Sequence, residues 1–432
     1  MKWFEDFFPL GPDAASPGHP FAAGEEQASP AGKIAWLLFC AASLQMMFLQ
    51  PSIVLLPGER TNLFSTLLAA LSLAATVWAA KKGAFIRNRG ELGLCLLLTA
   101  LVLLSGFLSA VPRTNTLRGV ALLAPALGGF WGARILLDTP ARQRAFLLLS
   151  LVMLTAFVLI GLVSWGVTGE ITTAMDPKYH SLATKVMLLW FAPLALLWGR
   201  LPQKILGVIL IALSYLLLLL TQLRSAMAIP LLLGGVAVFY GGLRLKYFLL
   251  ILLALSAILV YFIRHLPPER TGLQYEPAYY RAEYLMFSWH IAARHPLLGI
   301  GLLTPREKFL QDYAIKYPYV TREKFRHSLQ SIIVADNMFL TFMVGVGFPF
   351  LALYSFSLIK LLAGLVRSFG ASPSLGFIPP LALLLPLTAG ILTFFAYDLL
   401  LHPQVCWFFH LLLGMIPRNV GKIQSSRFQV PS

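Results

Sequence analysis

Apolar segments of membrane-spanning length recur along the chain and leave little room for any other fold. A helix needs about 20 mostly apolar residues to cross the roughly 30 Å hydrocarbon core of a bilayer. About twelve such segments can be counted, several of them short enough to shift the count by one or two. They cover residues 33–50, 63–80, 92–110, 117–137, 145–165, 182–198, 205–220, 226–241, 247–263, 337–359, 377–396 and 404–417. The sequence therefore predicts an all-α polytopic membrane protein.

The overall composition agrees with this class. Hydrophobic residues make up 58% of the chain, charged residues only 12%, and the mean hydropathy is +0.76, which lies outside the range of ordinary soluble domains. Residues 1–32 are rich in Pro, Gly and Ala and contain no signal-peptide core, so they are predicted to form a mobile cytoplasmic tail. Cys40, Cys95 and Cys406 lie inside apolar segments without metal-type spacing, which indicates small buried residues.

Lys and Arg are distributed unevenly between the two sides of the predicted bundle. Twelve spans place both termini on one side, and the termini and connections of that side carry eighteen Lys and Arg residues. Because cationic residues concentrate in short cytoplasmic connections, both termini are predicted to be cytoplasmic. The short connections of the opposite side carry only Arg60, Arg113, Arg118, Lys178, Lys185 and Arg224.

The predicted spans divide the chain into five parts. Spans one to nine cover residues 33–263, spans ten to twelve cover 336–417, and a long periplasmic connection at 264–335 lies between the ninth and the tenth. Residues 1–32 and 418–432 are the cytoplasmic tails. Connections of this length in compact proteins are usually functional, so the chemistry is expected in or beside the periplasmic loop.

The periplasmic loop is predicted to be a folded, helical cap. Between Ala278 and His295 apolar residues recur at three- and four-residue steps, which predicts a helix packed on the bilayer face. The stretch "HPLLGIG" then ends this helix, and two shorter helices are predicted at 304–313 and 321–334. Ten Lys and Arg against six Asp and Glu leave the loop cationic. This charge suits an anionic headgroup or a pyrophosphate, although contact with phospholipid phosphates is the simpler interpretation for most of these residues.

Arg224 lies between two apolar runs on the outer side, in "LLLLLTQLRSAMAIPLLL". An arginine at mid-helix costs about 2.5–3.5 kcal/mol on insertion scales, which makes an ionisable residue in the membrane a functional candidate. Arg224 either anchors a turn at the interface, where its side chain can snorkel, or points into a cavity and holds an anion. The pattern favours the second interpretation.

Three stretches of the chain resemble, in the same order, the pattern of the O-antigen ligase and O-antigen polymerase superfamily. They are "TQLRSAMAIPLLLGG", "YYRAEYLMFSWHIAARHPLLGIG" and "DNMFLTFMVGVGFPF". Proteins of this superfamily have about ten to fourteen helices and a large periplasmic loop between two late helices, which is similar to the layout predicted here. The resemblance implies a GT-C-like membrane glycosyltransferase of the bacterial inner membrane that uses undecaprenyl-pyrophosphate-linked donors.

The resemblance also implies residues of the active site. The ligase motif of this superfamily has His followed by Asn, Ser or Gln, then nine residues and Gly, then two residues and Gly, Thr or Tyr. Asp336 takes the place of the His, Asn337 and Gly347 match, and Phe350 departs from the pattern. His327, in the same loop, is a candidate to compensate for the missing histidine.

Arg224 and Arg281 correspond by motif position to the arginines of the family that are thought to bind the donor pyrophosphate. Cations would stabilise the charge that develops on this leaving group, and the outer segments show no carboxylate pair or His cluster at ligand spacing. Neither a metal nor another cofactor is therefore expected. Asp336 is the candidate base for the acceptor hydroxyl, with Asn337 and His327 as further catalytic candidates. Alternatively, Asp336 caps the tenth span, a position that favours Asp.

Three functions remain open at this point. The missing histidine favours an O-antigen or polysaccharide polymerase, whose acceptor is another lipid-linked glycan, over an O-antigen ligase, whose acceptor is the lipid A core. A polysaccharide or lipid transporter is a different class, but the sequence shows no internal repeat and few ionisable residues at mid-span. The expected partners are the undecaprenyl-pyrophosphate-linked donor, one of these acceptors and membrane lipid, with no nucleic acid.

Overall fold

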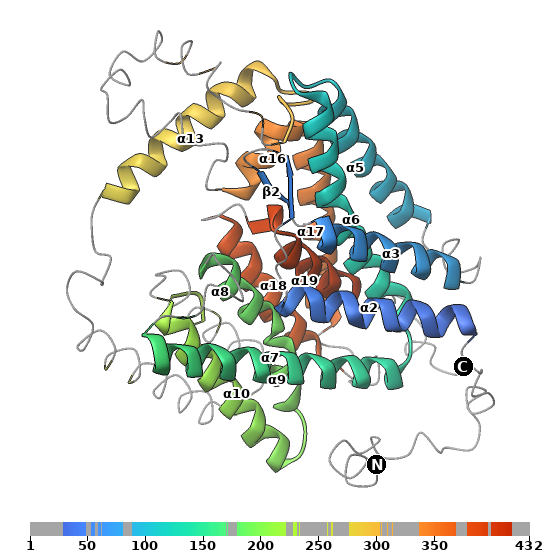
Figure 1. Ribbon diagram of the computed structural model, residues 1–432, viewed down its shortest axis with the longest axis vertical. Helices are drawn as coiled ribbons and strands as arrows, with labels where there is room; N and C mark the ends of the chain where they lie inside the picture. The colour runs from blue at the N-terminus through green and yellow to red at the C-terminus, as the bar shows by residue number, and fades with distance from the viewer. Residues whose placement is uncertain are drawn as a thin grey trace, which may run out of the picture.

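Figure 1 shows the fold as a computed structural model. The structure describes residues 29–48, 53–56, 59–61, 63–80, 89–169, 171, 179–221, 228–230, 233, 257, 261, 276–302, 304, 309, 313, 337–368, 378–395 and 399–416. Within these ranges only the backbone is described at 53–56, 59–61, 63, 179–180, 276–284 and 399. The predicted tails lie almost wholly outside the described residues, as does the predicted helix at 321–334.

The described elements are helices apart from one hairpin. In chain order they are α2 (Pro30–Phe48), β1 (Ile53–Leu56), β2 (Glu59–Thr61), α3 (Leu63–Ala79), α5 (Arg89–Phe107), α6 (Pro112–Leu136), α7 (Pro140–Thr168), α8 (Tyr179–Leu189), α9 (Phe191–Leu196), α10 (Leu201–Leu220), α13 (Glu276–Arg294), α16 (Met338–Val346), α17 (Phe348–Arg367), α18 (Pro380–Phe394), the 3-10 helix η5 (Leu399–Leu401) and α19 (Pro403–Gly414).

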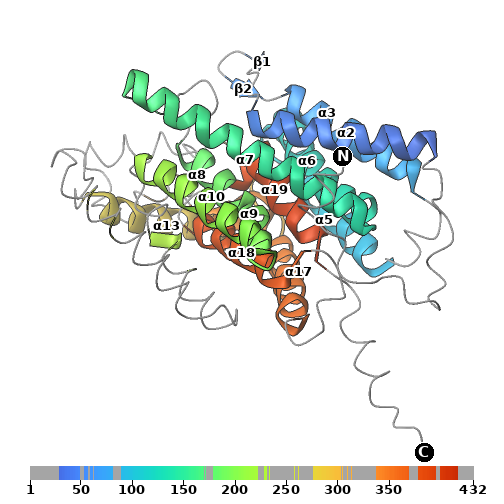
Figure 2. The ribbon, with the colours of Figure 1, turned by 90° about the horizontal axis from the view of Figure 1, so that it is seen from below.

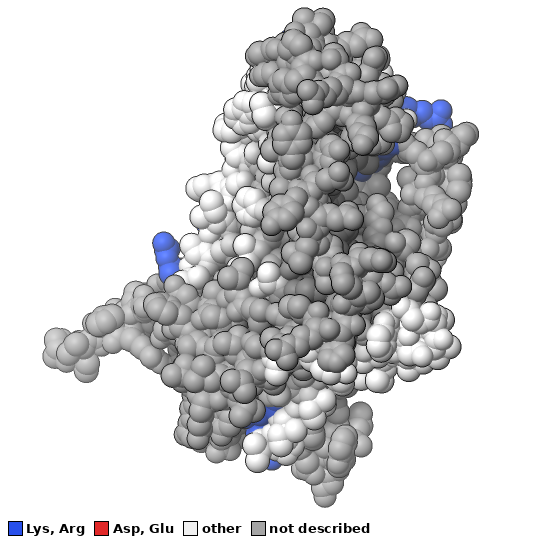
Figure 3. All heavy atoms as spheres, turned by 90° about the vertical axis from the view of Figure 1, so that its left-hand side faces the viewer, with Lys and Arg blue, Asp and Glu red and all other residues white. Residues whose placement is uncertain are grey.

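Six of the described helices are long and apolar enough to cross a membrane, namely α2, α5, α6, α7, α10 and α17. Their outward faces expose large apolar side chains such as Leu96, Val163 and Ile359, which suits contact with lipid tails. On the face shown in Figure 3 the described atoms in view are mainly uncharged. A helical, multi-pass membrane protein is thus confirmed, whereas the count of twelve spans and the GT-C-like arrangement stay predictions.

The predicted spans at 226–241 and 247–263 lie largely outside the described residues, and the span at 182–198 consists of α8 and α9. The other predicted spans coincide with described helices except at 337–359. The span predicted at 337–359 is wrong as a single helix. It consists of α16 and α17, which are separated at Gly347, where the backbone has φ 100° and ψ 169°. Pro349, in the first turn of α17, has no N–H to continue the hydrogen bonds of a preceding helix, so it favours a new helix start here.

A two-stranded hairpin, absent from the sequence prediction, lies in the connection between α2 and α3. β1 and β2 are antiparallel, with Ile53 opposite Thr61 and Val54 opposite Arg60. β-branched residues favour strands, and the residues between the strands in the sequence are Pro and Gly, a pair that favours turns. The hairpin is a local addition in one connection, and the predicted all-α class holds for the described bundle.

α6 and α19 lie at the centre of the bundle, between α2 and α3 on one side and α8 and α18 on the other (Figures 1 and 2). A Cβ at Gly129 of α6 would lie 2.5 Å from the carbonyl oxygen of Trp407 in α19. Small residues of this kind let membrane helices approach closely. The buried Trp407 indole N–H also donates to Ser43 Oγ of α2 at 3.2 Å, so α2, α6 and α19 pack as one unit.

Arg134, near the end of α6, joins three helices at one end of the bundle. Its guanidinium forms a bidentate ion pair with Glu91 at the start of α5, with N–O distances of 2.6 and 3.2 Å. It also donates to the backbone carbonyls of Gly414 and Ile416 at the end of α19. The Arg134 side chain is only 6% exposed, so its charge is balanced by these partners rather than by water. We call this end, where α5 begins and α6 and α19 end, the cationic end.

Candidate functional site

α13 packs onto α16 through its apolar face. Phe287 and Ile291 of α13 are buried against Met343 and Val344 of α16. The helix predicted between Ala278 and His295 is therefore confirmed. The expectation that this helix packs on the bilayer face is wrong for these residues, because α16 covers them.

The stretch "HPLLGIG" that follows α13 is hydrogen-bonded to the end of α16. The Ile300 N–H donates to the Val344 carbonyl at 2.8 Å. The Gly301 N–H donates to the Gly345 carbonyl at 2.9 Å. Gly299 has φ 62°, a conformation that favours glycine, and a Cβ there would collide with the Val344 carbonyl oxygen. Two stretches that carry the family resemblance thus form one packed unit.

α16 has nine residues, and Asn337 and Gly347 delimit it. Asn337 Oδ1 accepts a hydrogen bond from the Leu340 N–H at 3.1 Å, which satisfies one free donor of the first turn. The Gly347 N–H donates to the Phe342 carbonyl at 3.2 Å and closes the last turn. The nine-residue spacing between Asn and Gly in the family motif therefore corresponds here to one capped helix.

Asn337, not Asp336, occupies the cap position. The alternative in which Asp336 caps a tenth span is therefore wrong, since the next residue accepts the capping hydrogen bond. Asn337 Nδ2 also donates to the Phe395 carbonyl, just after α18, at 3.2 Å. These two hydrogen bonds fix the backbone directly after Asp336, which itself lies outside the described residues.

Asn115 of α6 anchors the segment that follows α13. It is buried, and its Nδ2 donates to Thr304 Oγ1 at 2.6 Å and to Ser109 Oγ at 2.9 Å. The Thr304 hydroxyl donates in turn to the Ile300 carbonyl at 2.7 Å. The start of α6 thus positions the segment that pairs with α16.

The length of α5 separates α16 from the cationic end. Glu91, near the start of α5, binds Arg134 at the cationic end. Ser105, near the end of α5, donates its hydroxyl to the Gly345 carbonyl of α16 at 2.6 Å. Fourteen helical residues separate Glu91 from Ser105, which corresponds to about 21 Å along the helix axis. We call the end that contains α16 the motif end.

The structure describes the side chain of Asn337 alone among the five predicted site residues. Arg281 lies on the described backbone of α13, but its side chain is outside the described part. Arg224, His327 and Asp336 also lie outside the described residues. Their grouping with Arg281 into one site therefore stays a prediction.

No group of three His, Cys, Asp or Glu side chains within the described ranges is arranged to hold a metal ion. The predicted independence from metals rests on the sequence alone and stays a prediction.

Lys185 is a buried cation for which the sequence interpretation needs correction. The charge pattern assigns it to an outer connection, whereas the structure places it inside α8 with 0% exposure. Lys185 Nζ lies 3.4 Å from the Met47 carbonyl oxygen and 5.2 Å from the centroid of the Phe157 ring. A carbonyl and an aromatic face both stabilise a cation. The sequence feature that could have predicted this burial is the position of Lys185 within the apolar span 182–198, where a cation is unusual.

Comparison with known families finds a match for the segment that contains α13 and α16. Residues 187–355 match the family model described as O-antigen ligase. This segment is therefore similar to the O-antigen ligase family, and it covers less than half of the 432 residues. The match runs from α8 into α17, and all five predicted site residues fall within it. No curated protein matches the chain.

Substituting Asn337 tests its two hydrogen bonds separately. Asn337→Ala removes both hydrogen bonds, and loss of the cap by itself is expected to lower the free energy of unfolding by about 0.5–2 kcal/mol. Asn337→Asp keeps the capping oxygen but loses the donor to the Phe395 carbonyl, so the expected loss is about 0.5–1.5 kcal/mol. Thermal unfolding of the purified protein in detergent measures both. Equal melting temperatures for wild type and Asn337→Ala would contradict the capping role.

Proposed function

We propose that this protein belongs to the O-antigen ligase and polymerase superfamily and is a membrane glycosyltransferase that transfers a glycan from undecaprenyl pyrophosphate to an acceptor hydroxyl on the periplasmic side. The observation that carries the proposal is the packed unit at the motif end, in which "HPLLGIG" and the capped helix α16 hold each other. Both stretches fall within the O-antigen ligase match. The motif end lies opposite the cationic end, which the positive-inside rule assigns to the cytoplasm. We therefore infer an inner-membrane protein with cytoplasmic termini.

The proposed reaction uses two cations and one carboxylate. Asp336 accepts the proton of the acceptor hydroxyl, whose oxygen forms a bond to the anomeric carbon of the donor sugar. The bond from this carbon to the pyrophosphate oxygen breaks, and undecaprenyl pyrophosphate leaves with the electron pair. Arg224 and Arg281 stabilise the charge that develops on the pyrophosphate. His327 is the candidate to orient the acceptor, and Asn337 fixes the backbone that carries Asp336.

We favour a polymerase because Asp336 stands where the ligase motif has His. An O-antigen ligase is the second candidate, because the matching family is described by that name. The two enzymes differ in the acceptor, which is a second lipid-linked glycan for the polymerase and the lipid A core for the ligase.

Reconstitution distinguishes these candidates. The purified protein is placed in lipid vesicles with an undecaprenyl-pyrophosphate-linked repeat unit as the only sugar substrate, and the products are separated on a gel. We expect a ladder of lengthening glycans. Absence of a ladder, with transfer once lipid A core is added, would identify a ligase instead. Movement of the lipid-linked glycan across the vesicle membrane without any new glycosidic bond would favour a transporter and contradict the proposal.

A further inference from the structure

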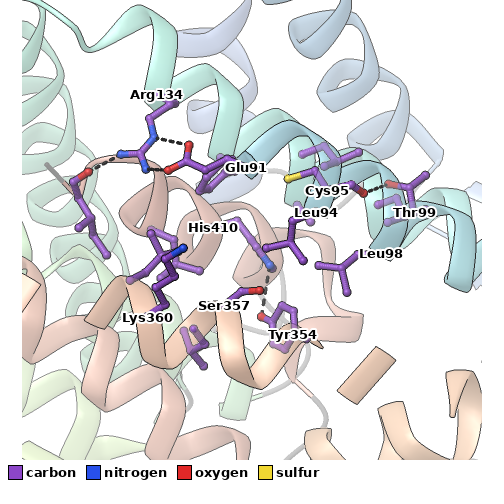
Figure 4. Close-up of a pocket in the computed structure, with 18 of the residues that line it drawn as sticks. Glu91, Leu94, Cys95, Leu98, Thr99, Arg134, Tyr354, Ser357, Lys360 and His410 are labelled. Atoms are coloured by element: carbon purple, nitrogen blue, oxygen red, sulfur yellow. Dashed lines mark hydrogen bonds and ion pairs between the residues drawn. The ribbon is translucent and has the colours of Figure 1, made fainter. Parts of the chain in front are cut away.

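A cavity of about 930 Å³ lies between α5, α6, α17 and α19 (Figure 4). This volume falls in the range of roughly 300–1,000 Å³ that is typical of ligand sites. Its wall is largely apolar and includes Leu94, Leu98, Leu123, Leu127 and Leu361. Neither the family match nor the proposed chemistry assigns a role to this cavity.

The polar groups along the middle of the cavity already have partners. The His410 Nδ1–H donates to the Cys406 carbonyl at 2.8 Å, which leaves Nε2 to accept from the Tyr354 hydroxyl at 3.3 Å. Thr99 and Ser357 donate their hydroxyls to carbonyls of their own helices. With these hydrogen bonds made, the middle of the cavity suits a hydrocarbon chain better than a polar ligand.

Two walls of the cavity are the helices that are most open to lipid. Only 17% of the apolar stretch of α5 and 22% of that of α17 is buried, against 61% for the central helix α6. Leu97 of α5 and Ile359 of α17 are exposed on the outward faces. These two walls of the cavity therefore lie at the periphery of the described bundle, with outer faces that suit contact with lipid.

The cavity is cationic at the end that lies beside Arg134. Glu91 already balances Arg134 (Figure 4). Lys360 and Arg367 of α17 also line the cavity, and neither has an ion-pair partner among the described residues. These two cations are seven residues apart, so they lie on the same side of α17 and about 10.5 Å apart along its axis. Two exposed cations beside an apolar chamber are complementary to a phosphate headgroup joined to a hydrocarbon chain.

We propose that this cavity binds an anionic glycerophospholipid, with an acyl chain between α5 and α17 and the phosphate at Lys360 and Arg367. Basic pockets between helices on the cytoplasmic side are known to hold anionic headgroups. The apolar wall of the cavity extends to Phe342 and Phe350 at the motif end, but the proposed headgroup position is distinct from the proposed glycosyl-transfer site, because about 21 Å of α5 separate the cationic end from the motif end. The inference thus adds a structural lipid in the cytoplasmic leaflet to the proposed enzyme.

Native mass spectrometry of the full-length, delipidated protein tests this site. The protein in detergent is titrated with phosphatidylglycerol, with phosphatidylcholine of the same acyl chains, and with undecaprenyl phosphate. We expect phosphatidylglycerol to bind at least about tenfold more tightly than phosphatidylcholine, because each cation near the phosphate favours the anionic lipid. Equal affinities for the two phospholipids would overturn the proposal.

Two variants locate the binding on the protein. Lys360→Gln with Arg367→Gln should lower the affinity for phosphatidylglycerol roughly tenfold or more, while Lys33→Gln with Lys204→Gln, cations that do not line the cavity, should change it by less than about twofold. Gly364→Phe keeps both charges but fills the cavity, since an added Cβ at Gly364 meets nothing within 4 Å, and it should weaken binding of both phospholipids.

Gly93→Phe is the matched control, because Gly93 of α5 also has open space but does not line the cavity. Unchanged phospholipid binding in the cavity variants would overturn the proposal. Displacement of bound phosphatidylglycerol by an equimolar amount of undecaprenyl phosphate would overturn it too, because the cavity would then belong to the polyprenyl donor.

Discussion

Replacing Gly347 by Ala is expected to lower the melting temperature strongly and to abolish glycan transfer. Gly347 has φ 100°, and holding an L-residue in such a conformation costs about 1–3 kcal/mol. A Cβ at this position would also collide with the carbonyl of Leu297. Relief of the collision requires the segment after α13 to move away from α16, which breaks hydrogen bonds such as that from Ile300 to Val344. The proposed site loses its scaffold as a result.

Thermal unfolding in detergent and the product ladder measure the two effects of Gly347→Ala. Gly364→Ala, in the helix α17 that follows Gly347, is the matched control, because an added Cβ there meets nothing within 4 Å. This control is expected to leave stability unchanged or raise it by about 0.5–1 kcal/mol, since Ala is a better helix former than Gly. A Gly347→Ala variant with wild-type melting temperature and product would show that the motif glycine serves another purpose.

The helices of the bundle were predictable because hydrophobic length is a local signal. The segment at 92–110 and α5 differ by only three residues at each end, and the stop signals after α13 are visible as Pro and Gly in the sequence. The division at Gly347 was also signalled locally, by Pro349 within an otherwise apolar run. The prediction of one span at 337–359 gave more weight to the apolar content of the segment than to Pro349.

The packing of the motif end was not predictable, because its contacts join residues that are distant in the sequence. Asn115 and Thr304 are 189 positions apart, and Ser105 and Gly345 are 240 apart. The hydrophobic periodicity of a single segment gives no information about pairs so far apart in the sequence. The same limit applies to Lys185, whose partners Met47 and Phe157 come from other helices.

Asn337 is the one candidate site residue whose side chain can be compared with the prediction within the described part of the chain. The resemblance placed Asn337 and Gly347 in one motif, and the structure explains their spacing by the length of α16. It also shows that Asn337 acts as a helix cap. A match to a family pattern at such positions therefore reflects folding as well as chemistry. Catalysis is expected instead at the charged candidates, Arg224, Arg281 and Asp336.

Arg224→Gln and Arg281→Gln should each reduce glycan transfer by about 10²–10³-fold, and the double variant should yield no detectable product. The reason is that removing one preorganised donor from developing charge typically costs this much. Binding of the pyrophosphate depends on both arginines in the proposed mechanism. The readout is the product ladder from vesicles with equal amounts of each protein, together with the melting temperature, which should stay near that of the wild type.

Arg294→Gln is the control within α13, because Arg294 lies in the last turn and outside the proposed pyrophosphate site. Its product level should stay within about twofold of the wild type.

Arg281→Lys keeps the charge but loses the bidentate geometry of the guanidinium, so an intermediate rate is expected if this residue binds two phosphate oxygens. Wild-type rates from Arg281→Gln or Arg224→Gln would remove that residue from the site. If both variants kept their activity, the cations needed for the leaving group would have to be sought elsewhere, beginning with Lys185, which is already buried inside the bundle.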